Sequence, residues 1–101
     1  MTAQTTNAQT ANVTAQDAIE FAPEAHRVAC KLVDEAFALD NEPARVRKLM
    51  EAVRAMRFAA FVAELGGMTA EAEGWTKEAD ALFECAAHIN AGIEQRIADA
   101  N

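Results

Sequence analysis

Apolar residues recur at every third or fourth position through the last third of the chain, residues 69–98. The apolar positions there are Ala72, Trp75, Ala79, Leu82, Ala86, Ile89, Ile93 and Ile97. This spacing stacks side chains on one face of an α-helix, while Asp80, Glu84 and Gln95 lie around the other side. Because such a helix gains most of its stability by packing its apolar face, the pattern predicts that other parts of the chain cover it.

A second helical pattern occupies residues 23–39. Its apolar positions are Ala25, Val28, Ala29, Leu32, Val33, Ala36 and Phe37. Pro23 is compatible with a first helical turn, where its missing N–H is not needed. Just before it, Asp17 and Glu20 have the spacing of a capping box. Since a proline inside a helix interrupts its hydrogen bonds, this order favours a short turn at residues 17–22, although a helix there stays open.

The third helical pattern, residues 42–65, has boundary signals on both sides. Asn41 and Pro43 suit a helix N-terminus, and Gly66 with Gly67 ends the helix. Thr69 is expected to cap the helix that follows. The main apolar positions are Val46, Leu49, Met50, Val53, Met56 and Ala60, and a rotated second set is Phe58, Phe61, Val62 and Leu65. An apolar arc of this width predicts that the helix lies centrally or meets another chain.

Three helices joined by two short connections predict an all-α, up-down-up bundle in which the first and third helices run parallel. No stretch alternates as a β-strand does. Residues 1–16 contain Thr, Gln, Asn and Ala with no charge and little apolar surface, so we expect a disordered tail. Residues 17–101 then form one helical-bundle domain.

The composition favours self-association. Apolar residues make up 51% of the chain, but 25 of the 101 residues are alanine, and a buried alanine contributes little free energy. Small chains whose core buries few large side chains often gain stability by oligomerising. We therefore expect a homodimer that uses the second set on residues 42–65 and the end of the last helix. The expected contact residues are Phe58, Phe61, Val62, Leu65, Ile93 and Ile97, with Trp75 either closing the core or meeting a partner.

Charge and missing residue types argue against several functions. The net charge is -7, which disfavours binding to nucleic acid and to anionic membranes. The chain contains no Ser, no Tyr and no glycine-rich phosphate loop, so we expect no enzyme and no cofactor. The N-terminus lacks the basic and apolar segments of a signal peptide, and two cysteines are too few to staple a secreted fold, so a cytoplasmic location is expected.

Two Cys and two His are the sharpest candidates for chemistry. His26 and Cys30 share a face of one helix, and Cys85 and His88 share a face of another. Together they are a valid zinc ligand set. However, the two pairs sit at different heights along parallel helices, and neither lies on an adjustable loop. We therefore expect no metal site, and keep a metal- or redox-responsive sensor as the alternative function.

Basic residues concentrate on residues 42–65, which hold five of the nine, against three of the sixteen acids. This segment therefore carries about +2 and the rest of the chain -9. A basic stripe can bind nucleic acid, the weaker alternative, but no aromatic residues interleave with it to stack bases. We favour packing of this basic helix between two acidic ones.

These patterns together predict a small non-enzymatic module that works by binding another protein as an adaptor, regulator or inhibitor. Its partner is another protein of unknown identity or a second copy of the chain. No membrane is expected to be involved.

Overall fold

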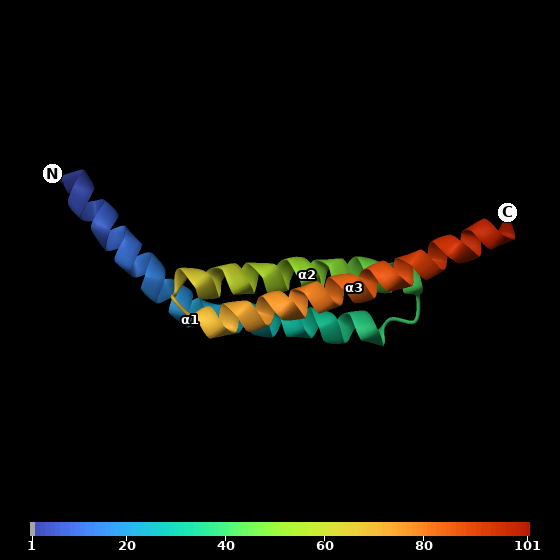
Figure 1. Cartoon of the computed structure of the whole chain (residues 1–101). Helices are drawn as coiled ribbons and strands as arrows, with labels where there is room; N and C mark the ends of the chain where they lie inside the picture. Colours follow the sequence, from blue (N-terminus) through green and yellow to red (C-terminus); the bar gives the residue numbers. More distant parts are fainter. Residues whose placement is uncertain (1) are drawn as a thin grey trace.

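The chain folds into three helices in the order up-down-up, each antiparallel to the next, as the sequence predicts (Figure 1). The computed structural model describes the backbone of residues 2–101 and the side chains of residues 15–101. Helix α1 spans Thr2–Ala38, α2 spans Glu42–Leu65 and α3 spans Thr69–Ala100. Helix α2 packs closely against both of its neighbours, so it is the central element. No strand occurs within residues 2–101.

Helix α1 begins earlier than expected and runs through Pro23 without a break. The expected turn at residues 17–22 is therefore wrong: these residues are helical. Proline removes one hydrogen bond, here the one to the carbonyl of Ile19, and bends a helix more often than it stops one when both sides are packed. Figure 1 shows the first part of α1 leaving the bundle at an angle. The described backbone of residues 2–16 continues α1, and side chains are described only from Ala15 onward, so the disordered tail expected at residues 1–16 is not tested and stays a prediction.

The two connections are short and fixed by hydrogen bonds. Asn41 accepts a hydrogen bond from the N–H of Ala44 at 2.8 Å and caps α2, as its position predicts. Arg45 donates to the carbonyl of Leu39 at the end of α1. In the second connection Gly67 has a φ of 77°, a conformation that favours glycine. The expected cap at Thr69 is wrong, because Met68 occupies the cap position and offers no side-chain hydrogen bond.

The core contains three layers of buried residues, and each helix contributes at least one residue to each layer. Successive layers are seven residues apart on every helix, which is two helical turns. From the α2–α3 connection to the opposite end, the layers are Ala22, Ala63 and Ala72, then Ala29, Met56 and Ala79, then Ala36, Leu49 and Ala86. Both outer helices thus present alanine in every layer, which lets their backbones approach α2 closely.

The larger buried side chains come from α2. Leu49, Val53 and Met56 are the largest fully buried residues, and each contributes about 1.5–3 kcal/mol to stability by leaving water. By contrast, Val28 and Phe37, expected on the buried stripe of α1, are about half exposed. The core of this bundle is therefore the apolar face of α2 clamped between two alanine faces.

The helices overhang one another at the two ends of a rod of 68 × 23 × 19 Å. Figure 1 shows α3 continuing past the start of α2 at one end, and α1 starting well before the end of α2 at the other. The described helices contain no segment long and apolar enough to cross a membrane.

Candidate functional site

An exposed apolar face lies along the outer side of α1 and α2. Phe58 and Phe61 on α2 are 51% and 59% exposed, and Leu65 follows them at helical spacing. Phe21 of α1 meets Phe58 edge to face, with ring centroids 6.2 Å apart. Val28 lies two turns after Phe21 on the same side of α1. We call this group the aromatic face: Phe21, Val28, Phe58, Phe61 and Leu65.

Not all of the contact residues expected from the sequence belong to this face. Val62 is only 6% exposed and packs in the first core layer, so it is not available to a partner. Trp75 is half-buried and packs against two layers. Ile93 is half-buried near the C-terminal end of α3, and Ile97, on the overhang of α3, is 57% exposed. This overhang is at the opposite end of the rod from the aromatic face (Figure 1).

Charged residues of opposite sign lie near the aromatic face at different heights along the rod. On α1, the exposed carboxylates of Asp17 and Glu20 lie about one turn or less from Phe21, and Glu24 is paired with Arg27. On α2, Arg47 and Arg54 precede Phe61 at intervals of seven residues, so they continue its column along the helix, away from the α2–α3 connection.

Other basic residues of α2 pair with the neighbouring helices. Lys48 lies 3.9 Å from Glu35 of α1, and Arg57 lies 3.7 Å from Asp80 of α3. These pairs are partly or largely exposed, so each is worth little on its own. Their placement nevertheless fits the interpretation of a basic helix between acidic ones. A further pair, Arg96 with Glu42, reverses the roles.

The structure separates the four Cys and His residues into two places. His26 and Cys30 lie together against the middle layer, whereas Cys85 packs against the third layer. His88 is exposed. From the layers, Cys85 stands about five residues further along the bundle than Cys30, which is ~8 Å at 1.5 Å per residue. A disulfide needs Cα atoms within about 7 Å, so these two thiols cannot pair within the chain as it is folded.

A different third residue joins the first pair. Glu78 of α3 reaches across to α1, and its Oε2 atom lies 3.2 Å from Nε2 of His26. The same Nε2 atom lies 3.7 Å from Sγ of Cys30. The His26 ring stacks on Trp75 with centroids 4.3 Å apart and planes 12° from parallel. His26, Cys30 and Glu78 form what we call the α1–α3 cluster.

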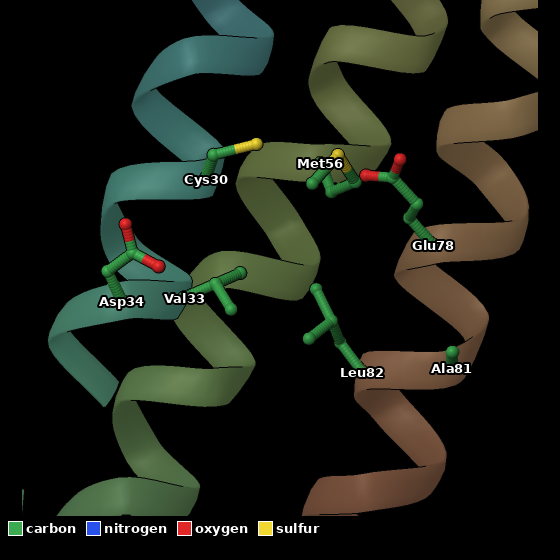
Figure 2. A pocket seen from close by; sticks show the side chains of 7 residues that line it. All are labelled: Cys30, Val33, Asp34, Met56, Glu78, Ala81 and Leu82. Carbon is green, nitrogen blue, oxygen red and sulfur yellow. The ribbon is translucent and has the colours of Figure 1, made fainter. Parts of the chain in front are cut away.

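The α1–α3 cluster borders an open pocket of about 370 Å³. Figure 2 shows the Cys30 thiol and the Glu78 carboxylate pointing toward each other from α1 and α3. The other lining residues include Val33, Met56 and Leu82, which are apolar. Burial raises the pKa of the Cys30 thiol, and the negative charges of Glu78 and Asp34 raise it further. The thiol is therefore protonated at neutral pH unless a cation compensates these charges.

Sequence reasoning missed Glu78 because nothing in its own neighbourhood marks it. It lies 52 residues from His26, and only the lateral approach of α3 to α1 brings the two together. The exposed Phe21 was missed because the residues around it were expected to form a turn over the core.

Comparisons with protein-family models, with curated proteins and with solved structures find no match for this chain.

Proposed function

We propose that this protein is a non-enzymatic interaction module that forms a homodimer through the aromatic face. The observation that carries the proposal is the exposure of Phe58, Phe61 and Leu65 side by side on a chain whose core consists mainly of alanine side chains. Large apolar patches on soluble proteins mark interaction sites. Aromatic residues are also enriched at the centres of protein interfaces.

The small core favours a second copy of the chain as the occupant, because small chains often gain stability by oligomerising. A two-fold axis that lies in the aromatic face and runs parallel to the rod places α1 of one copy against α2 of the other. Each copy then covers the exposed Phe21, Phe58 and Phe61 of the other.

The test is the mass of the untagged protein in solution, measured by light scattering during size-exclusion chromatography. We expect the natural chain to be a dimer and Phe61→Glu to be a monomer, because a buried unpaired carboxylate at the centre of an interface is strongly unfavourable. Phe58→Glu should act in the same direction.

The chain offers two matched controls. Phe37 has nearly the same exposure as Phe58, at 50%, but it lies outside the aromatic face, so Phe37→Glu should remain dimeric. Ile97→Glu charges the overhang of α3 and should also remain dimeric. The proposal is wrong if the natural chain is a monomer at micromolar concentration, or if Phe37→Glu and Phe61→Glu behave alike.

A further inference from the structure

A second region of the molecule has a geometry that the homodimer does not use. The α1–α3 cluster brings an imidazole, a thiol and a carboxylate together from two helices, with all three ligand atoms within 4.8 Å of one another. We propose that His26, Cys30 and Glu78 bind one Zn²⁺ ion per chain, with the fourth coordination position open to the neighbouring pocket. This site is independent of the aromatic face.

The distances fit a tetrahedral zinc. Bonds of about 2.0–2.3 Å place the ligand atoms of such an ion roughly 3.3–3.6 Å apart. Nε2 of His26 lies 3.2 Å from Oε2 of Glu78 and 3.7 Å from Sγ of Cys30. Sγ of Cys30 also lies 3.8 Å from Nδ1 of His26, so the His26 and Cys30 side chains have to turn before Nε2 and Sγ can face one ion.

The ligand types also favour zinc over other common ions. Imidazole and thiolate are ligands of zinc and the later transition metals, whereas Mg²⁺ and Ca²⁺ prefer oxygen alone. Three protein ligands with one open position are typical of zinc sites that bind an exchangeable water or ligand. The open position faces Val33, Met56 and Leu82, so a water held there would sit against apolar walls.

The surroundings orient the ligands and compensate the ion's charge. Trp75 stacks on the His26 ring and fixes its plane, which is the role that supporting residues play around metal ligands. Asp34 stands one turn beyond Cys30 at the pocket, and its charge acts on the thiol. With Glu78 and an ionised Cys30, this corner of the molecule carries local negative charge that a divalent cation would offset. Glu78 is half exposed, so an ion can reach the site from solvent.

Zinc would tie α1 to α3. Both helices pack on α2, and the α1–α3 cluster is where their side chains bridge directly. An ion that binds only the folded chain stabilises it by mass action. The free energy of unfolding of the bundle would therefore increase with the concentration of free zinc.

The experiment starts from the full chain freed of metal by dialysis against a chelator. Zinc is added in competition with a chromophoric chelator, and cobalt is added in parallel for its absorption spectrum. We expect one ion per chain, a higher melting temperature, and a thiolate-to-cobalt charge-transfer band. Trp75 is the only tryptophan, so a change in its emission would report the ion at the stacked His26 ring.

Variants separate this site from other thiols and imidazoles. Loss of a supporting residue typically weakens metal binding about 10–100-fold, so loss of a ligand should cost at least about 100-fold. Cys30→Ser and Glu78→Gln should both show this loss, and Glu78→Gln keeps a group that can hydrogen-bond His26. Cys85→Ser and His88→Gln are the matched controls and should bind as the natural chain does. No uptake by the natural chain, or equal uptake by Cys30→Ser, would overturn the proposal.

Discussion

At the scale of single residues, Gly66 shows how close the backbones come. A Cβ atom at this position would lie 3.0 Å from Cγ1 of Ile19 and 3.1 Å from the backbone N of the same residue. The side chain of Ile19 can turn away, but its backbone sits in α1 and cannot. The φ of Gly66 is -86°, which any residue adopts, so its requirement for glycine is one of space alone.

Gly66→Ala should therefore destabilise the bundle by about 1–3 kcal/mol, the usual cost of forcing an extra carbon into a packed site. The matched change is Gly74→Ala, because Gly74 lies inside α3 with open space around it. Alanine is a better helix former than glycine by about 1 kcal/mol, so this variant should be more stable. Urea unfolding at one fixed protein concentration measures both. A Gly66→Ala chain as stable as the natural one would mean that α1 does not approach the connection this closely.

The thiol of Cys30 gives the zinc site a pH dependence. Its pKa is raised by burial and by the charges of Glu78 and Asp34, and the α2 residue at the pocket, Met56, is uncharged. Below that raised pKa, zinc must displace one proton from the thiol, so affinity rises with pH. One proton released from the thiol for each ion bound makes the apparent affinity increase about tenfold per pH unit above neutrality. Competition titrations at successive pH values measure this slope, and a flat profile would remove the thiolate from the site.

At the scale of elements, the alanine layers explain what the sequence could and could not predict. The bounds of α2 follow from Asn41, Pro43 and Gly66, whose chemistry is local. The buried face of α1 was assigned partly to Val28 and Phe37, because large apolar residues were expected inside. The available signal was the spacing of seven between alanines on both outer helices, which marks faces that approach another helix closely. Large side chains on α1 are then displaced to the edges.

Ala79 is fully buried in the middle layer, so a larger side chain there would force the helices apart. Ala79→Leu adds three carbons between Ala29 and Met56 and should destabilise the fold by about 1–3 kcal/mol. Ala81→Leu is the matched control, because Ala81 is exposed at the edge of the pocket. Thermal unfolding followed by circular dichroism compares the two. Equal melting temperatures of the two variants would show that the middle layer accommodates a leucine side chain at position 79 without strain.

At the scale of the whole molecule, the up-down-up order follows from three periodic segments and two short connections. The relative placement of features on different helices does not follow, because it depends on which faces meet. The aromatic face and the overhang of α3 were grouped as one interface from their sequences, yet they lie at opposite ends of the rod (Figure 1). For the same reason Glu78 could not be assigned to His26 and Cys30 before the helices were placed beside one another.

The overhang of α3 should be the least protected described part of that helix. All side chains of residues 94–101 are exposed, so the backbone hydrogen bonds there are supported by little packing. Hydrogen–deuterium exchange should be fast in residues 94–100 and slow between Ala72 and Ile89. Since the proposed dimer leaves this end uncovered, dimerisation should not slow its exchange. Protection there equal to that of the core layers would instead place a second copy on the overhang.

The repetition of alanine along α1 has one more consequence. Ala15, Ala22, Ala29 and Ala36 are spaced seven apart, so sliding α1 by two turns would bring alanine back to every layer. The alanine positions alone therefore fit two alignments of α1, and the repeat by itself does not distinguish them. What excludes the second is the connection between Ala38 and Glu42, because three linking residues reach at most about 10 Å and have no slack for such a slide. The alignment of α1 in the bundle thus depends on a three-residue connection, and lengthening it would permit the shifted alignment within the same topology.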